Sequence, residues 1–144
     1  MLKNLRKRGK SQKAFTLVEL VVVIAILSIL AAIAVPVITS SMNSARISTM
    51  KSNRATVDML LKEAVNTSKV SLTTVKYNNK RVSEATVEDV LKENNISLDV
   101  MKVHKIGSVQ YAIKWISTQE GAVLESGTSV QAYDITKKIA DIGN

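Results

Sequence analysis

The sequence predicts an α+β protein in which one long N-terminal helix packs against a small antiparallel β-sheet. Three patterns along its 144 residues support this. An apolar run extends from Leu20 to Ile38, an amphipathic helical pattern follows to about Val65, and apolar and polar residues alternate between Val109 and Trp115. A period near 3.6 indicates a helix, and a period of two indicates a half-buried strand. At this length we expect one folded domain behind an N-terminal anchor.

The positive charge of the chain is concentrated at its N-terminus. Six of the 20 Lys and Arg residues lie in the first 14 positions, which contain no Asp or Glu. The remaining 14 bases face 12 acids, so we expect no direct nucleic-acid partner. The absence of cysteine excludes disulfides and thiolate chemistry, and the single histidine, His104, excludes a multi-histidine metal site. We therefore expect no metal and no cofactor.

The apolar run is long enough to cross a lipid bilayer. Between Leu20 and Ile38 only Ser28 and Pro36 interrupt it, and these 19 residues span about 28 Å as a helix. A helix that is apolar on every face can be buried only in a large protein, and roughly 100 other residues cannot supply one. The basic residues before the run keep the N-terminus inside the cell, so we expect the rest of the chain outside.

Polar residues in this segment need an explanation. Glu19 places a carboxylate at the cytoplasmic end of the span, where a charge requires a partner. Pro36 lacks an amide hydrogen and clashes with the carbonyl of Ala32, so we expect it to kink or loosen the helix. Ser28 is able to donate a hydrogen bond to the carbonyl of Ile24 and therefore costs little in a membrane.

The residues around Glu19 form a specific pattern. The stretch Ala14-Phe15-Thr16-Leu17-Val18-Glu19 follows the basic leader and precedes the apolar run that contains Pro36. It resembles the N-terminus of type IV prepilins, whose leader ends in a small residue followed by Phe-Thr-Leu-x-Glu and an apolar helix with a proline near its far end. The resemblance covers roughly residues 9–40. It implies the type IV pilin fold, a long N-terminal helix covered by a small antiparallel sheet.

The resemblance also implies how the chain is processed. In that family a prepilin peptidase cuts on the cytoplasmic side, here between Ala14 and Phe15, and Phe15 becomes the N-methylated terminus. The family usually has glycine where this chain has Ala14, which is small enough for cleavage. Glu19 matches the glutamate that neutralises the terminal amine of a neighbouring subunit, and Thr16 and Leu17 belong to the same assembly motif. An ammonium and a carboxylate buried together cost far less than either alone.

The expected helix extends beyond the membrane. No Gly or Pro occurs between Val37 and Thr67, and strict heptads are not sustained, which argues against a coiled coil. We expect one helix from Phe15 to Val65. The apolar stripe of its second half comprises Ile47, Met50, Val57, Leu61 and Ala64. The predicted segments are a leader (1–14), a transmembrane or filament-core helix (15–38), an amphipathic continuation (39–66) and a globular head (67–144).

The head is expected to contain a hairpin, a short helix and a three-stranded antiparallel meander. The hairpin pairs residues 72–77 with 80–82 around Asn78-Asn79. The helix begins at Thr86 and reaches Glu93. The meander comprises residues 109–115, 122–125 and 129–135. The face that we expect to pack on the long helix carries Val109, Tyr111, Ile113 and Trp115.

No pattern in the sequence predicts catalysis. Ser48-Thr49-Met50-Lys51 fits the Ser-x-x-Lys motif of penicillin-recognising enzymes, but the companion Ser-Asp-Asn and Lys-Thr-Gly motifs are absent. His104 has no acid within four residues, and we expect it to be a solvated surface residue. No phosphate-binding glycine loop, paired-carboxylate motif or calcium loop occurs in the sequence. We therefore expect no enzymatic activity.

These observations favour a structural subunit of a type IV pilus. The precursor would sit in the cytoplasmic membrane with its N-terminus inside, lose residues 1–14 and polymerise through its N-terminal helix into a filament at the cell surface. The expected partners are other pilin subunits, including minor pilins, prepilin peptidase, the pilus assembly platform and the membrane. The alternatives are a type II secretion pseudopilin, a competence pilin, or a signal-anchored surface protein that never polymerises. Because it lacks cysteine, the chain resembles the cysteine-free pilins that are found more often in Gram-positive bacteria.

Overall fold

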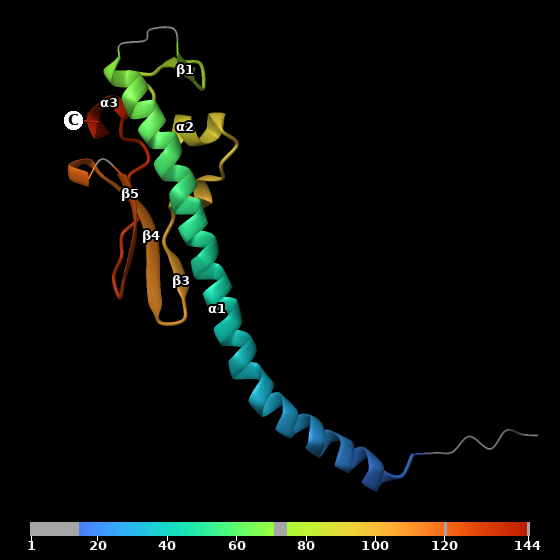
Figure 1. Cartoon of the computed structure of the whole chain (residues 1–144). Helices are drawn as coiled ribbons and strands as arrows, with labels where there is room; N and C mark the ends of the chain where they lie inside the picture. Colours follow the sequence, from blue (N-terminus) through green and yellow to red (C-terminus); the bar gives the residue numbers. More distant parts are fainter. Residues whose placement is uncertain (1–14, 71–74, 120, 144) are drawn as a thin grey trace, which may run out of the picture. The chain divides into compact units, whose positions relative to one another are not determined.

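The computed structural model describes residues 15–70, 75–119 and 121–143 (Figure 1). Its elements are α1 (Leu17–Lys69), β1 (Lys76–Tyr77), β2 (Lys80–Arg81), α2 (Val87–Glu93), η1 (Leu98–Met101), β3 (His104–Ile106), β4 (Val109–Ile116), η2 (Ser117–Gln119), β5 (Gly121–Gly127) and α3 (Ile139–Ile142). The predicted α+β class is confirmed, with a long N-terminal helix packed against small antiparallel sheets. The predicted leader and the start of the predicted hairpin, residues 72–74, lie outside the described residues.

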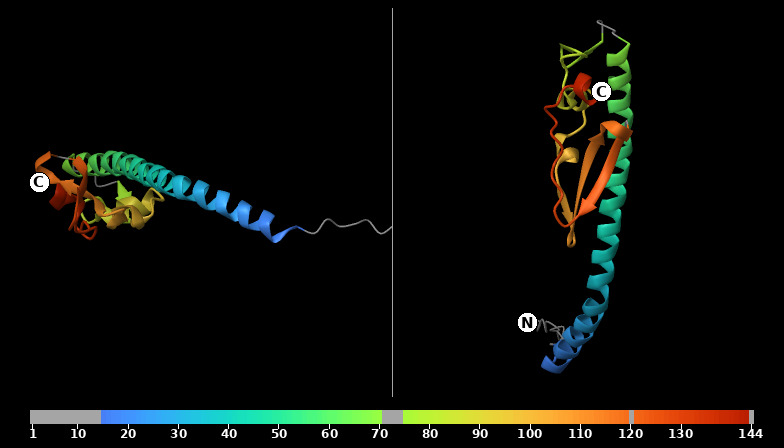
Figure 2. Two further views of the ribbon diagram at one scale, coloured as in Figure 1. Left: turned by 90° about the horizontal axis from the view of Figure 1, so that it is seen from below. Right: turned by 90° about the vertical axis from the view of Figure 1, so that its left-hand side faces the viewer.

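The chain divides into two compact units, Met1–Ser40 and Ser41–Asn144. The described part of the first unit is the apolar portion of α1. The second unit contains the rest of α1 and the head, and Figure 2 shows the sheet beside this part of the helix. Among the described residues, the second portion of α1 packs against the head, whereas the side chains of the first portion are exposed.

One face of α1 is buried in the second unit. Four of the five residues of the predicted stripe are buried, and Ile47 is half-buried. The buried α1 residues are Met50, Val57, Leu60, Leu61, Ala64 and Val65. All of these except Met50 share one core with Leu91 of α2, Trp115 of β4 and Ile139 of α3. Burial of a side chain of this size contributes about 1.5–3 kcal/mol, so this face holds the head on the helix.

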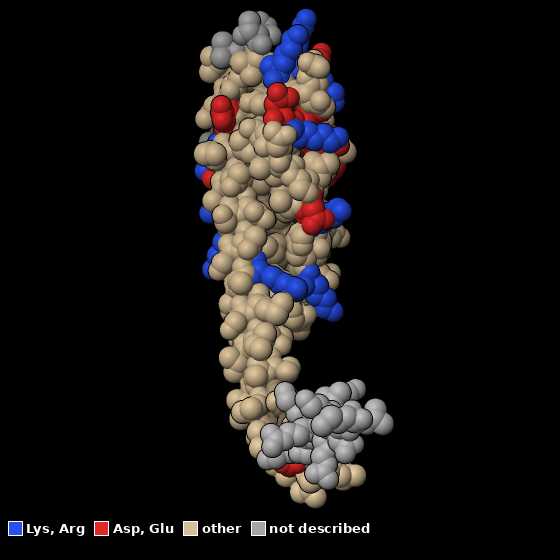
Figure 3. All heavy atoms as spheres, turned by 90° about the vertical axis from the view of Figure 1, so that its right-hand side faces the viewer, with Lys and Arg blue, Asp and Glu red and all other residues tan. Residues whose placement is uncertain are grey.

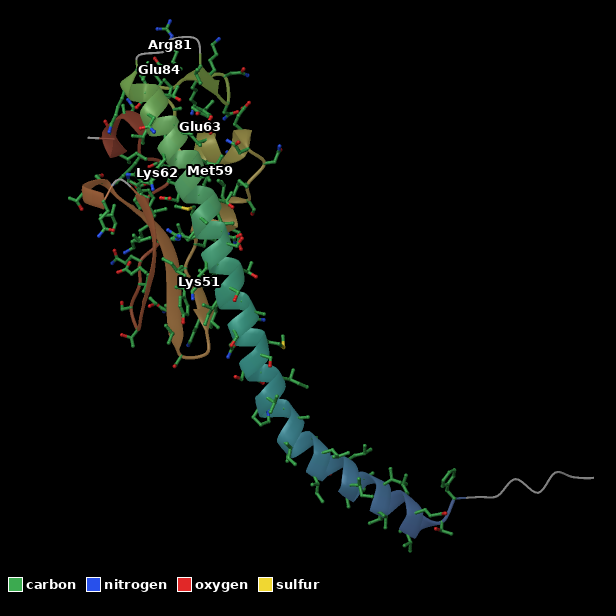
Figure 4. The ribbon with its side chains drawn as sticks, viewed as in Figure 1. Lys51, Met59, Lys62, Glu63, Arg81 and Glu84 are labelled. Carbon is green, nitrogen blue, oxygen red and sulfur yellow. The ribbon has the colours of Figure 1, made fainter. Side chains whose placement is uncertain are left out.

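Polar side chains of α1 fix the start of β5. Arg54 Nη1 donates to the carbonyl of Ala122 at 3.2 Å, and the amide of Ala122 donates to Asp58 Oδ1 at 2.7 Å. Lys62, labelled in Figure 4, holds the other oxygen of Asp58 at 3.0 Å. Burial alone would raise the pKa of Asp58, but these contacts lower it below its usual value. Both backbone groups of Ala122 are thus tied to one helix, which sets the register of β5 against α1.

The sheet is three-stranded and antiparallel, with the order β3-β4-β5. The predicted strands at 109–115 and 122–125 are confirmed, and Ile113 and Trp115 of the predicted face lie in the core. The predicted strand at 129–135 is wrong, because the amide of Val130 donates to the side chain of Gln110 at 3.0 Å instead of joining a ladder. The third strand is β3. It joins β4 through a two-residue turn in which Gly107 has φ +63°, a conformation that favours glycine.

The predicted hairpin tip and short helix are confirmed in the described residues. Asn78 and Asn79 have φ values of 49° and 62°, as a type I′ turn requires, and they join β1 to β2. Thr86 caps α2, and its side chain and that of Asp89 form a reciprocal capping box. The helix ends before Asn94, whose amide bonds back to the last turn. Local sequence chemistry therefore accounts for both elements.

Candidate functional site

The first unit presents a helical segment whose apolar side chains are exposed. The large apolar residues between Leu17 and Ile38 are 50–78% exposed. Within the described residues, α1 is the helix long and apolar enough to cross a membrane, and its most apolar 18-residue window has a mean hydropathy of 3.1. Figure 3 shows a stretch of α1 whose visible face carries no charged side chain. A surface of this extent needs lipid or other apolar helices around it.

A capping box closes the N-terminus of this helix. The amide and the hydroxyl of Thr16 both donate to Glu19 Oε2 at 2.9 Å, and the amide of Glu19 donates to Thr16 Oγ1 at 3.2 Å. The structure therefore joins two of the predicted assembly residues. The side chains of Phe15 and Leu17 are exposed, and Ala14 lies outside the described residues. The spacing Thr-x-x-Glu before an apolar run is a capping-box signal that the sequence analysis missed.

Hydroxyl groups in the apolar segment are satisfied within the helix. Ser28 Oγ donates to the carbonyl of Ile24 at 2.7 Å, as predicted, and Thr39 Oγ1 donates to the carbonyl of Val35 at 2.9 Å. Neither hydroxyl therefore needs water in an apolar environment. α1 continues through Pro36, and the kink expected there stays a prediction.

The described residues contain no group of three or more His, Asp or Glu side chains that could hold a metal ion. His104 is half-exposed, and its Nε2 lies 2.9 Å from the carbonyl of Asp99. A carbonyl only accepts, so Nε2 is the donor in this contact. His104 thus has a structural partner that its neighbours in the sequence did not reveal.

Comparison with known families places the candidate site in a recognised motif. Residues 9–35 match the family described as the prokaryotic N-terminal methylation motif. The match contains Ala14, Phe15 and Glu19 and ends one residue before Pro36. Comparisons with curated proteins and with solved structures gave no match. The chain therefore carries, on an exposed apolar helix, the class III N-terminal signal of type IV pilins and pseudopilins.

Proposed function

We propose that the protein is a prepilin and that its mature form is a structural subunit of a type IV pilus. The observation that carries this proposal is the exposed apolar portion of α1 with the methylation motif at its start. Lipid solvates such a helix before assembly, and neighbouring helices would solvate it in a filament. A subunit could then pass from membrane to filament without exposing this surface to water.

The start of α1 supports the proposed processing. Cleavage between Ala14 and Phe15 would remove residues 1–14 and leave Phe15 as the N-terminus to be methylated. Because α1 begins at Leu17 and is capped by Thr16, this cut would leave both the helix and its cap intact. Residues 15–38 would then form the membrane or filament-core segment, residues 39–66 the support of the head, and residues 67–144 the head. In this scheme Pro36 makes α1 easier to bend around that residue.

Glu19 is the residue we propose for register in the filament. Its carboxylate would meet the terminal ammonium of a neighbouring subunit, with Thr16 and Leu17 beside it. Burying the ammonium and the carboxylate together in the apolar interior costs far less free energy than burying either charge alone. The partners are then other copies of the chain or related pilins, a prepilin peptidase and the assembly platform.

A second candidate shares the same signal. A type II secretion pseudopilin or a competence pilin would carry the same motif on the same kind of helix, so the match does not separate these roles. A signal-anchored surface protein would differ from all of them because it keeps its leader and never polymerises.

The test is the N-terminal residue of the protein extracted from membranes, with an active or an inactivated prepilin peptidase co-expressed. We expect the active peptidase alone to remove 14 residues and leave Phe15 at the front, with one added methyl group where methylation occurs. Sheared cell-surface material should then contain filaments of the processed chain. If the leader stayed intact in the presence of active peptidase, the proposal that the protein is a prepilin would be refuted. If the leader were removed but no surface filaments formed, the pseudopilin role would be favoured.

A further inference from the structure

β5 is an edge strand, because the order of the sheet is β3-β4-β5. In an antiparallel ladder, alternate residues direct their backbone N–H and C=O groups toward the paired strand, and the residues between them direct these groups away. Ala122 directs both groups away from β4, because they bond to Asp58 and Arg54 of α1. Leu124 and Ser126 follow Ala122 at every second position of the same regular ladder. Their N–H and C=O groups therefore also point away from β4.

The edge of β5 is satisfied at Ala122 and open beyond it. At Ala122, side chains of α1 bond to both backbone groups. Within the described residues, nothing bonds to the outward backbone groups of Leu124 and Ser126. Each of these two residues thus offers one donor and one acceptor to an added strand. The opposite edge, β3, has only three residues and is a shorter template.

A groove of about 530 Å³ lies at this edge, between α1 and the β4–β5 pair. Its lining consists of Ile47, Lys51, Arg54, Tyr111, Leu124 and Ser126, which all belong to the second unit. The side chains of Ile47, Tyr111 and Leu124 are only half-buried, so each still presents apolar surface to the groove. The groove therefore offers room for side chains directly beside the open backbone groups of β5.

The lining of the groove is cationic. It contains Lys51 and Arg54 but no Asp or Glu. Arg54 is held by its hydrogen bond to the carbonyl of Ala122, whereas Lys51, labelled in Figure 4, is exposed and forms no ion pair among the described residues. A strand added to β5 would direct alternate side chains toward α1. Charge complementarity favours a carboxylate among those side chains.

We propose that the edge of β5 is a docking site for an extended acidic segment of another protein, which adds to the sheet as a further strand. Its backbone would bond to Leu124 and Ser126, and its carboxylate would meet Lys51. A second copy of the chain fits less well, because Glu125 of its β5 is already paired with Lys114 and brings no free carboxylate. The docking site is independent of the proposed filament role, so either proposal can fail without the other.

The test uses the ¹⁵N-labelled full chain in phosphatidylcholine nanodiscs, with its backbone amides observed by NMR. The probe is the acetylated and amidated peptide Thr-Val-Thr-Glu-Thr-Val-Thr, whose Val and Glu side chains share one face of a strand. We expect saturable shifts and about tenfold slower hydrogen exchange at Leu124 and Ser126, because their amides gain acceptors. The amides of Val123 and Glu125 already bond to β4 and should change little.

Matched peptides separate strand addition from general charge attraction. In one peptide the amides of Val and Glu are N-methylated, and in another those of the inner Thr residues are. Only one edge of the added strand faces β5, so one set of methyl groups should abolish the protection and the other should leave it. A peptide with Lys in place of Glu should bind about fivefold more weakly, because like charges replace an exposed ion pair.

Variants of the chain test the same edge. Ser126→Pro removes an amide that points away from β4, where an edge strand tolerates proline, and should abolish the protection of Leu124. Ser126→Thr keeps the amide and should bind as the wild type does. Lys51→Glu should reverse the preference between the Glu and Lys peptides, whereas Lys76→Glu on β1 should leave it unchanged. An unchanged amide signal of the buried Ile139 shows that each variant is folded.

The outcomes decide the proposal. Protection of Leu124 and Ser126 that needs one set of peptide amides and follows the charge at Lys51 supports the docking site. Equal binding of the Glu and Lys peptides, equal effects of the two methylated peptides, or no saturable change at the two amides would overturn it. Protection without any peptide when two chains share one nanodisc would also overturn it, because a second copy would then occupy the edge.

Discussion

Glu19 Oε2 accepts hydrogen bonds from both the amide and the hydroxyl of Thr16, each at 2.9 Å. The amide of Glu19 returns a bond to Thr16 Oγ1 at 3.2 Å. Two of the three contacts use the carboxylate, both through the same oxygen, and in the described part of the chain Oε1 of Glu19 accepts no hydrogen bond. One residue can therefore cap its own helix and still offer an oxygen to a donor from another molecule.

Replacing Glu19 should separate membrane insertion from assembly. Glu19→Ala leaves the apolar segment unchanged, so we expect normal insertion, measured by extraction from membranes. Filament yield should fall strongly, because an unpaired buried ammonium costs about 3–5 kcal/mol. Normal filaments, counted by electron microscopy, would remove Glu19 from the proposed mechanism.

Two control variants distinguish the charge of Glu19 from its cap. Glu19→Gln keeps an oxygen for the bonds from Thr16 but loses the charge, and it should assemble as poorly as Glu19→Ala. Thr16→Val removes the hydroxyl, costs the helix start about 1 kcal/mol, and should retain most filaments. If Thr16→Val were as defective as Glu19→Ala, capping and not charge pairing would explain the phenotype.

Replacing Pro36 tests the proposed compliance of α1. Pro36→Ala restores an amide that is able to bond to the carbonyl of Ala32, and alanine favours the helix interior by about 3 kcal/mol over proline. We expect slower amide hydrogen exchange around residue 36 in membranes and fewer filaments, with unchanged insertion. Val35→Ala, beside it, is the matched control. Equal filament yields for the two variants would contradict a role for proline.

The parts of the fold that sequence predicted are those governed by near neighbours. The helical stripe through Leu61, the Asn78-Asn79 turn and the Thr86 cap each depend on residues within a few positions. β3 has only three residues, too few to show a period. The contacts from Arg54 and Asp58 to Ala122 join residues 68 and 64 positions apart, so no local pattern reports them.

Part of the candidate site could likewise be predicted from the sequence, and part of it could not. Its motif is contiguous in the sequence, and the match to residues 9–35 agrees with the prediction. The Thr16–Glu19 cap was also encoded locally and was overlooked. The pocket in the second unit that Arg46 of α1 and Lys105 of β3 help to line, in contrast, exists only in the folded head, because these residues lie far apart in the sequence.

Asp89 should make the stability of the head depend on acid pH. Its carboxylate is buried and accepts bonds from Asn78 Nδ2 at 2.9 Å, Lys80 Nζ at 2.8 Å, and the amide and hydroxyl of Thr86. Burial alone would raise the pKa of Asp89, but these donors outweigh it and hold the pKa well below its usual value. The unfolded chain therefore takes up this proton at higher pH than the folded chain.

Because the pKa of Asp89 is lower in the folded chain, the free energy of unfolding should fall in acid. The stabilisation from Asp89 is complete above the unfolded pKa of about 4 and is lost as the pH falls toward the folded pKa. Asp89→Asn should lower the free energy of unfolding at pH 7 by about 1–3 kcal/mol and flatten its decline in acid, measured by urea unfolding of the full chain. Glu84→Gln removes a charge from an exposed side chain (Figure 4) and should leave the curve unchanged. Parallel curves for Asp89→Asn and the wild type would show that Asp89 contributes nothing.

Trp115 joins the C-terminal segment to the sheet through a hydrogen bond, and this bond should limit local unfolding of α3. Its buried Nε1 donates to the carbonyl of Ile142 at 2.9 Å, and the amide of Ile139 donates to the carbonyl of Ala85 at 2.9 Å. Trp115→Phe keeps an aromatic ring but leaves that carbonyl without its donor, at a cost of about 1–3 kcal/mol. We expect faster amide exchange at Ile139 and Ile142 than in the wild type, and a smaller loss of global stability.

Tyr111 supplies the matched control for this substitution. It lies on the same strand and is half-buried, so Tyr111→Phe removes a hydroxyl without touching the C-terminal segment. Exchange at Ile139 and Ile142 should then match the wild type. If both variants accelerated exchange equally, the effect would come from β4 as a whole. Acceleration confined to Trp115→Phe would show that one indole hydrogen bond holds α3 on the core, because the other anchor of α3, from Ile139 to Ala85, is present in both variants.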